Sequence, residues 1–302
     1  MSLPTDLELE VAESFKSLFP FIDKVRFLKT GSEACQAAIR FARAKTETRD
    51  IFCSGYHGWH DDFTSLTSPS AGVVGNHFID TKEDKQKIAI IEPIELEMSE
   101  AAKTKLIGMR SKYEVLIADE IITGFRVPKY SVSSYYNVAP DIICFGKAIA
   151  NGMPLSVVAG TKVIMDNPDV FVSSTFSGEC LSLVACQTVI REILKRNLTA
   201  LYERANLFMD NVNSVISSIG VKIEGYGTRG MLNTSDYNTA IFMQEACKAG
   251  LLFGKAYFYN FAHMEEEIED FAMTIIHDVV SKIKKGKVRL EGKLPNSGFK
   301  RY

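Results

Sequence analysis

Short apolar runs recur along the first part of the chain, and stretches with the pattern of amphipathic helices lie between several of them. The runs cover residues 50–55, 87–94, 114–121, 141–146 and 155–160, and the helical patterns include 32–45 and 99–112. Apolar strands of this kind are typical of a parallel sheet with both faces covered by helices. The alternation predicts an α/β fold with a mainly parallel sheet, and it predicts that ligands bind where the strands end.

The pattern changes after residue 180. Residues 181–196, 200–219 and 264–285 have the spacing of long helices, and short mixed elements lie between the second and the third. We therefore expect two domains, a large domain over residues 1–196 and a small α+β domain over residues 197–302. Residues 292–302 are expected to form a surface tail.

The composition is that of an ordinary globular protein, and it excludes several kinds of partner. Of the 302 residues, 46% are hydrophobic and 24% are charged. The 35 basic residues are offset by 37 acidic ones, for a formal charge of -2, and they form no basic stripe. A nucleic acid or an anionic membrane therefore has no electrostatic support as a partner, and a small molecule fits better.

Six cysteines, at positions 35, 53, 144, 180, 186 and 247, lack the close pairing of a structural zinc site. We expect them to be reduced thiols, as in a cytosolic protein. The N-terminus carries acidic residues where a secretion signal has basic ones, and no apolar run reaches the length of a membrane span. These features predict a cytoplasmic location.

Lys147 follows the apolar run 141–146 directly. A phosphate-binding P-loop would need glycine five residues before its Gly-Lys pair and Ser or Thr after it, whereas Asp141 and Ala148 stand there. A partly desolvated lysine can instead form a Schiff base with an aldehyde cofactor. The alternative is a lysine that extends from the strand end into solvent.

A pyridoxal phosphate (PLP) site also needs an acid for the pyridinium nitrogen and an anion cradle for the phosphate. Asp119 ends an apolar run, where a pyridinium partner would compensate its buried charge; an aspartate that caps a turn is the alternative. Thr30, Gly31 and Ser32 precede an amphipathic helix, whose N-terminal N–H groups and dipole attract anions. An ordinary capping box with Glu33 is the alternative there.

The stretch "GYHGWHD" (55–61) supplies Tyr56, His57 and Trp59, any of which could lie against a flat heteroaromatic ring. His57, His60 and Asp61 would alternatively be metal ligands. No second His/Glu cluster stands nearby in the sequence to complete such a site, so we expect no metal.

Taken in order, these segments resemble the class III (fold type I) PLP-dependent aminotransferases, and within them the branch of glutamate-1-semialdehyde 2,1-aminomutase. The matching stretches, from about residue 7 to 275, are "VRFLKTGSEACQAAIRFARAKTETRDI", "GYHGWHD", "IIEP", "LIADEIITGFRV", "PDIICFGKAIANGMPLSVVAG", "STFSGE" and "FAHMEEEIED". The D-E-x-x-T-G-F-R and G-K-x-x-x-x-G-x-P patterns together are highly specific. The resemblance implies a three-layer large domain and a small α+β C-terminal domain.

The resemblance also implies roles for individual residues. Lys147 would be the Schiff-base lysine, and Asp119 would keep the pyridine nitrogen protonated. Gly31 and Ser32 would bind the phosphate.

Further contacts with the cofactor follow from the same resemblance. Tyr56 would stack on one face of the cofactor ring, and Ile121 would contact the opposite face. His57 would be a further cofactor-binding residue. Family members form homodimers in which a threonine completes the neighbouring subunit's phosphate site, and Thr175 takes that place here.

The implied activity is the transfer of an amino group from a small-molecule donor to an aldehyde or keto acceptor, with Lys147 as general base and acid. Typical members are longer at the N-terminus, where a segment helps to cover the active site. The stretch between Asp61 and Glu92 is also shorter than in the aminomutases, in which a gating loop retains the intermediate. We therefore expect intermolecular transamination rather than intramolecular amino transfer.

Two other functions remain open: a PLP-binding protein with little turnover, and a metal hydrolase that uses His57, His60, Asp61 and Asp119. The substrate stays open as well, since an ω-amino acid, an amino-aldehyde or a keto-sugar would each suit the sequence. Arg126 and Arg229 are candidates for binding a substrate carboxylate.

Overall fold

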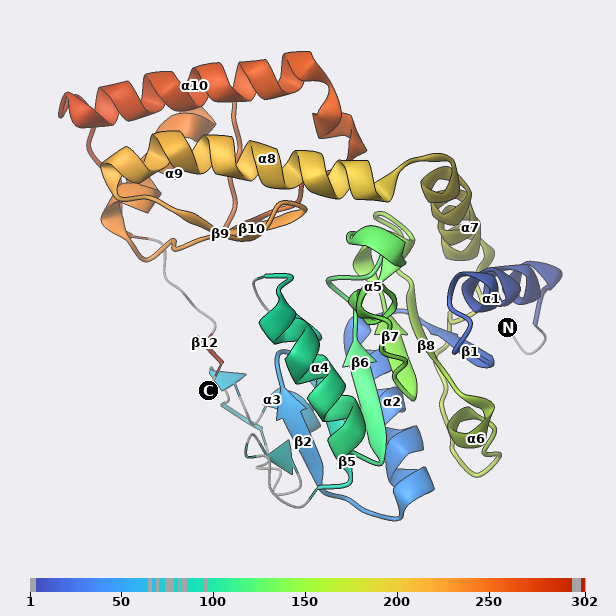
Figure 1. Ribbon diagram of the computed structural model, residues 1–302. Helices are drawn as coiled ribbons and strands as arrows, with labels where there is room; N and C mark the ends of the chain where they lie inside the picture. Colours follow the sequence, from blue (N-terminus) through green and yellow to red (C-terminus); the bar gives the residue numbers. More distant parts are fainter. Residues whose placement is uncertain are drawn as a thin grey trace. The chain divides into compact units, whose positions relative to one another are not determined.

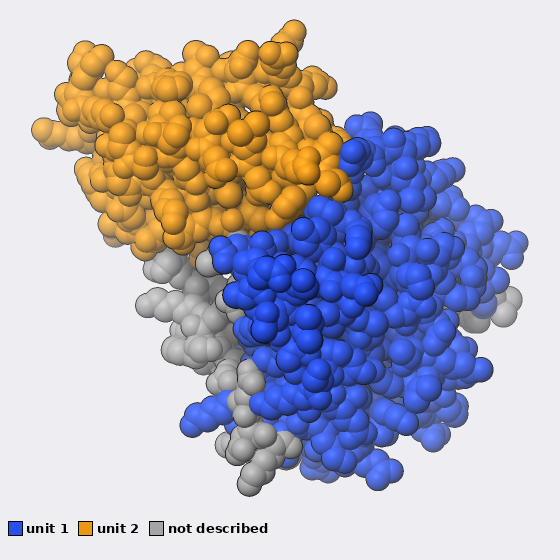
Figure 2. All heavy atoms as spheres, viewed as in Figure 1, with its two compact units in different colours: residues 1–198, 300–302 blue, residues 199–299 orange. Residues whose placement is uncertain are grey.

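The computed structural model describes residues 4–64, 67–68, 71–73, 79–80, 82, 86–94, 97–294 and 300–301. These residues form two compact units (Figure 2). One contains the described residues up to Leu198 together with residues 300–301, and the other contains those from Thr199 to Leu294.

The first unit is built on a seven-stranded sheet with the order β1-β8-β7-β6-β5-β2-β4 (Figure 1). The strands are β1 (Lys24–Leu28), β2 (Ile51–Ser54), β4 (Ile79–Asp80), β5 (Ile88–Ile91), β6 (Val115–Asp119), β7 (Ile142–Phe145) and β8 (Ser156–Gly160). The pairs from β4 to β7 are parallel, and β8 is antiparallel to both β7 and β1. The predicted α/β fold with a mainly parallel sheet is confirmed.

Each of the five predicted apolar runs contains a strand, whereas β1 was not among them. Its sequence, KVRFL, alternates charged and apolar residues, and it lies at the edge of the sheet. An edge strand is covered less completely than a central one, so it lacks the continuous apolar run that marks the others.

The helices of this unit are α1 (Asp6–Leu18), α2 (Gly31–Thr46), α3 (Asp61–Thr64), α4 (Glu100–Lys112), α5 (Val132–Tyr136), α6 (Lys162–Met165) and α7 (Cys180–Lys195). Short 3-10 helices cover Pro128–Tyr130 and Lys147–Ile149. A two-stranded antiparallel pair joins β3 (Thr67–Ser68) to β12 (Lys300–Arg301), where the sequence predicted only a tail.

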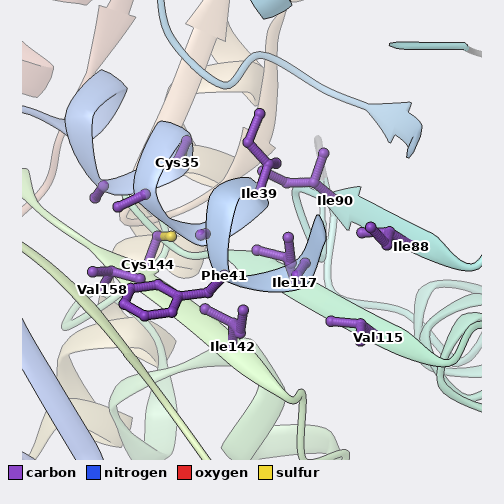
Figure 3. Packing of buried hydrophobic residues seen from close by; sticks show 14 of the residues in the cluster. Cys35, Ile39, Phe41, Ile88, Ile90, Val115, Ile117, Ile142, Cys144 and Val158 are labelled. Atoms are coloured by element: carbon purple, nitrogen blue, oxygen red, sulfur yellow. The ribbon is translucent and has the colours of Figure 1, made fainter. Parts of the chain in front are cut away.

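Helix α2 packs across one face of the sheet (Figure 3). Cys35, Ile39 and Phe41 on the helix belong to one buried cluster with alternate residues of the strands, namely Ile88 and Ile90, Val115 and Ile117, and Ile142 and Cys144. The alternation follows from the two-residue period of a strand. Each large side chain buried there contributes about 2 kcal/mol, and together they fix α2 against the strands.

The opposite face carries an aromatic cluster. Phe145 of β7 lies 4.9 Å from Phe19 and 5.6 Å from Phe15 between ring centroids, and 6.0 Å from Phe125. Phe145 is the neighbour of Cys144 in the strand, so the two side chains point to opposite faces. The sheet therefore lies between α2 on one side and this cluster, which includes α1, on the other. The cluster holds the end of β7 immediately before Gly146 and Lys147.

The strand directions bring the candidate residues to one edge of the sheet. Strands β2, β5, β6 and β7 are mutually parallel, and β1 runs the same way because it is antiparallel to β8. Their carboxyl ends therefore meet at one edge, the usual place for ligands in such sheets. The segments that follow are Lys29–Ser32, Gly55–His57, Glu92, Glu120–Ile122 and Lys147, while the reversed β8 begins at the same edge after Met153–Leu155.

The second unit is an α+β arrangement. It contains α8 (Leu198–Ile216), apart from its first residue, β9 (Ile223–Tyr226), β10 (Arg229–Leu232), α9 (Tyr237–Lys248), β11 (Ala256–Tyr257) and α10 (Glu266–Lys284), with 3-10 turns at Ser217–Ile219 and Phe261–Met264. The strands form an antiparallel sheet in the order β11-β10-β9. Val212, Ile216, Phe242, Ile276 and Val279 lie at the centre of its core. Across the described ranges, no helix has the length and apolar character of a membrane span.

Candidate active site

A cavity of about 450 Å³ opens at the edge where the strands end. Seven of the predicted site residues line it: Gly31, Ser32, Tyr56, His57, Asp119, Ile121 and Lys147. They come from four different strand ends, those of β1, β2, β6 and β7, so the fold rather than the local sequence brings them together. Thr175, the eighth, is exposed in a turn and is not part of this lining.

Asp119 is the centre of a buried hydrogen-bond network. Its Oδ2 atom lies 2.7 Å from His57 Nδ1 and accepts from the Cys35 thiol at 3.3 Å. Its Oδ1 atom accepts the backbone N–H of Ile121 at 3.0 Å. A carboxylate offers about four lone-pair positions, of which these donors occupy three. One position on Oδ1 is left for a further donor, as the protonated nitrogen of a pyridine ring requires.

Both ring nitrogens of His57 face acceptors. Nδ1 faces the Asp119 carboxylate, and Nε2 lies 3.1 Å from the carbonyl oxygen of Ser54. An imidazole that donates from both nitrogens is the charged form. Burial alone lowers the pKa of His57, but the interactions with Cys53 and with Asp119 outweigh it and raise the pKa well above its ordinary value. His57 thus supports the carboxylate from the side.

Lys147 is held in a strained backbone conformation beside the cavity. Its φ of 47° lies in the left-handed region, which residues other than glycine rarely adopt. Burial lowers the pKa of Lys147; the negative charge of Asp119 opposes this shift, and the positive charge of Arg126 adds to it. A larger fraction of the amine is therefore uncharged and nucleophilic near neutral pH than for a lysine in water.

Ile121 fills the space between Gly31, which lines the cavity, and Gly146, the residue before Lys147. A Cβ atom on Gly31 would lie 3.1 Å from Ile121 Cγ2, and one on Gly146 would lie 3.1 Å from Ile121 Cδ1. The side chain is thereby pressed between the start of α2 and the residue before Lys147. It forms an apolar wall of the cavity, as expected for a residue that contacts a ring face.

The start of α2 is both a capping box and a candidate anion cradle. The Thr30 hydroxyl accepts the N–H of Glu33 at 3.3 Å, and Glu33 Oε2 accepts the N–H groups of Lys29 and Thr30, each at 2.8 Å. The cap does not use the N–H groups of Gly31 and Ser32, which belong to the first turn and have no carbonyl one turn before them to bond. The two alternatives that the sequence left open therefore coexist.

The loop after β2 is fixed against this cradle. Ser32 Oγ accepts the N–H of Trp59 at 3.2 Å, which leaves the Ser32 hydroxyl proton available to an anion. A Cβ atom on Gly58, whose φ is +106°, would approach Ser32 Oγ to 2.2 Å and Ser32 Cα to 2.7 Å. Only glycine fits so close an approach.

Three ionisable residues of the cavity lining were not predicted as site residues: Cys35, Glu92 and Lys29. Glu92 Oε2 accepts the N–H of Tyr56 at 3.1 Å and so fixes the loop that carries this ring. Its position directly after β5, inside the matched "IIEP" stretch, was the signal that could have identified it.

Lys29 connects the cradle to α7. Its Nζ atom lies 2.7 Å from Glu179 Oε1, 3.0 Å from the carbonyl oxygen of Pro154 and 3.4 Å from Ser182 Oγ. Glu179 in turn caps α7 by accepting the N–H groups of Leu181 and Ser182. The ion pair therefore joins segments that are 150 residues apart.

The remaining candidates lie in different places. Trp59 is 69% exposed, so its ring faces solvent. The group of possible metal ligands in the described part of the chain consists of Cys35, His57 and Asp119, and it contains neither His60 nor Asp61. This grouping does not support the metal hydrolase, the alternative function that would use those two residues.

Of the two arginine candidates, Arg126 contributes a positive charge that lowers the pKa of Lys147. Its guanidinium group donates to the carbonyl oxygen of Ile122. Arg229 belongs to β10 in the second unit. Residues 65–66, 69–70, 74–78, 81 and 83–85 of the shortened stretch between Asp61 and Glu92 lie outside the described residues, so the expectation built on its gating loop stays a prediction.

Comparisons with known proteins agree with this geometry. The family model described as Aminotransferase class-III matches residues 75–280. A protein named glutamate-1-semialdehyde 2,1-aminomutase from Wigglesworthia glossinidia brevipalpis is 30% identical, over 95% of this chain and 80% of that protein. A protein of the same name from Saccharolobus islandicus (strain L.S.2.15 / Lassen #1) is 34% identical, over 64% of this chain and 54% of the relative, so the match spans about half of that protein's length.

Among solved structures, the fold resembles that of the FumI protein of Sphingopyxis sp. MTA144, described as its PLP internal aldimine form. The TM-score is 0.82 at 20% sequence identity, over 96% of this chain and 78% of that one. This likeness concerns the fold. The family match and the relatives at 30% identity or more carry the assignment: the chain belongs to the class III aminotransferases, a family of PLP-dependent enzymes.

Proposed function

We propose that this enzyme transfers an amino group between a small-molecule amino donor and an aldehyde or keto acceptor, with Lys147 as the residue that binds PLP covalently. The observation that carries the proposal is the placement of a lysine of lowered pKa in the same cavity as the Asp119 carboxylate. PLP, when bound, supplies an electron sink for the carbanion that forms at the substrate carbon.

The chain's own residues would keep that sink in its active state. Asp119 has one acceptor position left on Oδ1, where it would hold a proton on the ring nitrogen. His57, whose pKa is raised, is hydrogen-bonded to Oδ2 and so fixes the orientation of the Asp119 carboxylate. A charge preorganised in a buried site needs no rearrangement during the reaction.

The cavity walls would orient the cofactor. The N–H groups of Gly31 and Ser32, with the Ser32 hydroxyl, would bind the phosphate at the start of α2. Ile121 offers an apolar wall on one side, and Tyr56 lines the cavity as the aromatic candidate for the other face.

Lys147 would then move protons between the substrate carbon and the cofactor. Because burial lowers its pKa, its Nζ atom can accept a proton near neutral pH and return it within the cavity. Glu92, also in the lining, opposes that shift through its negative charge.

We further propose a homodimer in which Thr175 completes the partner's phosphate site. Phe171 and Phe176 on either side of Thr175 are 75% and 67% exposed, as is typical of apolar side chains that a partner covers. Ser174 Oγ donates to Glu33 Oε1 at 3.3 Å, so this segment is attached to the cradle of its own chain.

Intramolecular amino transfer is the second candidate, because the relatives cited above are named glutamate-1-semialdehyde 2,1-aminomutase. The two functions differ in their need for a second substrate. An aminomutase converts glutamate-1-semialdehyde alone, whereas an aminotransferase requires a separate donor and acceptor. A cytoplasmic location, with reduced cysteines, is part of the proposal as well.

The first test is borohydride reduction of the PLP-loaded protein, followed by peptide mapping. We expect a pyridoxyl group on Lys147 in the wild type and none in Lys147→Ala. Loaded wild type is then assayed with amino donors and keto or aldehyde acceptors, and separately with glutamate-1-semialdehyde alone. An unmodified Lys147 would contradict the proposal, while trapping without turnover would favour the PLP-binding protein.

A further inference from the structure

Three potential metal ligands meet at the inner end of the cavity. Cys35 Sγ, His57 Nδ1 and an oxygen of Asp119 all lie within 4.8 Å of one another. The three side chains come from α2, from the loop after β2 and from the end of β6. They are almost fully buried, at 1%, 2% and 4% exposure, yet each borders the cavity.

Their outer contacts are those of a metal site. The second ring nitrogen of His57 is held by the carbonyl oxygen of Ser54 at 3.1 Å, so Nδ1 points at the group. The second oxygen of Asp119 is held by the N–H of Ile121 at 3.0 Å. Histidine and carboxylate ligands of metals are commonly oriented by such bonds.

The present distances need little change to admit an ion. The 2.7 Å between His57 Nδ1 and Asp119 Oδ2 and the 3.3 Å between Cys35 Sγ and the same oxygen are hydrogen-bond lengths. Ligands of one tetrahedral Zn²⁺ stand roughly 3.3–3.6 Å apart, given metal–ligand bonds of about 2.0–2.3 Å. These two spacings therefore need to change by less than 1 Å, and since all three residues line the cavity, the fourth ligand would come from it.

The chemistry of the ligands selects a class of ion. A thiolate, an imidazole and a carboxylate suit Zn²⁺ and its spectroscopic substitute Co²⁺ rather than Mg²⁺ or Ca²⁺. A coordinated thiol is deprotonated by the ion itself. Binding would therefore release two protons to water, one from the Cys35 thiol and one from His57 Nδ1, while the metal takes their place.

We propose that the PLP-free enzyme binds one Zn²⁺ through Cys35, His57 and Asp119, and that zinc and PLP exclude each other. The exclusion rests on the proposed function, since it requires Asp119 to serve the cofactor's ring nitrogen. The ion would bind Oδ2 in place of the two hydrogen bonds now made there, and its charge would repel the protonated ring nitrogen that Oδ1 is left to hold. Free zinc would then control how much of the protein loads with cofactor.

The experiment titrates Co²⁺ into PLP-free protein and follows thiolate-to-cobalt charge-transfer absorption. We expect one Co²⁺ per chain in the wild type and in Cys180→Ser, which removes an exposed thiol of the same unit. In Cys35→Ser the charge-transfer band should disappear, and in His57→Gln binding should weaken more than tenfold. Added PLP should abolish the charge-transfer band by displacing Co²⁺. Zinc should slow the binding of PLP, and excess PLP should restore it.

Each alternative outcome decides the matter. A hydrogen-bond network without metal affinity gives no cobalt band, and a band that survives in Cys35→Ser places the ion elsewhere; either result overturns the inference. If Cys35→Ser does not fold, the rate at which Cys35 of the wild type is alkylated is measured with and without zinc. A rate that zinc does not reduce would refute the site. Borohydride trapping on metal-free protein tests the proposed function separately, because it requires no zinc.

Discussion

The ammonium group of Lys29 lies 2.7 Å from the carboxylate of Glu179, and this ion pair ties the residue before the anion cradle to the first turn of α7. Lys29 also bonds the carbonyl oxygen of Pro154, which follows the Lys147 segment. One ammonium group therefore ties two borders of the cavity to the start of α7.

The Glu179 carboxylate is expected to make the stability of the fold depend on pH in the acidic range. Burial alone would raise the pKa of Glu179, but the hydrogen bonds from Lys29 and Ser182 outweigh it and lower the pKa to about 2. A carboxyl whose folded-state pKa is depressed stabilises the fold above its ordinary pKa, and that contribution is lost as the pH falls towards 2. Because solvent screens the pair, we expect a contribution of about 1 kcal/mol.

Urea unfolding of wild type and Glu179→Gln between pH 6 and pH 3 measures this contribution. The gap between the two proteins should shrink as the pH falls. Asp50→Asn removes an exposed carboxylate from the same unit and corrects for the loss of one charge. A gap that is constant with pH would mean that the ion pair does not stabilise the fold.

Asp119→Asn should abolish most of the amino transfer while PLP still binds. The amide has nearly the same shape but carries no charge, so it cannot keep a proton on the cofactor's ring nitrogen. Loss of one preorganised electrostatic group typically costs about 10²–10³ in rate. Steady-state kinetics with saturating PLP measure the loss, and Asp62→Asn, outside the cavity lining, is the control. Turnover within a few-fold of wild type would contradict the role given to Asp119.

Two glycines with nearly the same backbone angle offer a matched comparison. Gly58 has φ +106° and faces Ser32 at 2.2–2.7 Å, whereas Gly152 has φ +107° and nothing within 4 Å. Gly152→Ala should cost only the backbone strain, about 1 kcal/mol. Gly58→Ala adds a collision with Ser32, and we expect a loss of about 3 kcal/mol together with weaker PLP binding.

Thermal and urea unfolding of both variants, with a PLP titration, tests this comparison. Equal losses in the two proteins would show that the contact between Gly58 and Ser32 relaxes without cost.

Glu120 is expected to be a stability residue rather than a catalytic one. Its buried carboxylate accepts from Thr123 Oγ1 at 2.6 Å, from the N–H of Val132 at 2.9 Å, and from the N–H and hydroxyl of Ser133 at 2.8 and 2.7 Å. Glu120→Gln would turn an amide N–H₂ group towards donors and should cost about 3 kcal/mol. Ser133→Ala removes only part of the network and should cost about 1 kcal/mol. Urea unfolding of both variants measures these losses in the free energy of unfolding. A Glu120→Gln protein as stable as the wild type would refute the role.

The strand pattern was predictable because it is local. Continuous apolar runs mark central parallel strands whatever the rest of the chain does, and Asp119 and Lys147 are polar residues at the ends of two of them. Since parallel strands end at one edge, their proximity followed from the fold class.

The contacts that complete the site were not predictable in this way. Cys35 and Asp119 are 84 residues apart, and Lys29 and Glu179 are 150 residues apart, so no local sequence pattern predicts either contact. The sequence left His57 open between ring stacking and metal binding; its actual partners, Asp119 and the carbonyl of Ser54, depend on the three-dimensional path of the loop.

The left-handed backbone at Lys147 also bears on how such an enzyme can lose its activity during evolution. A β-carbon at that position costs about 1 kcal/mol that glycine would not. Mutation to glycine would thus stabilise the fold while it removes the reactive amine. Only selection for turnover keeps lysine there, so an inactive descendant of this chain should drift towards glycine at position 147 sooner than at its other cavity residues.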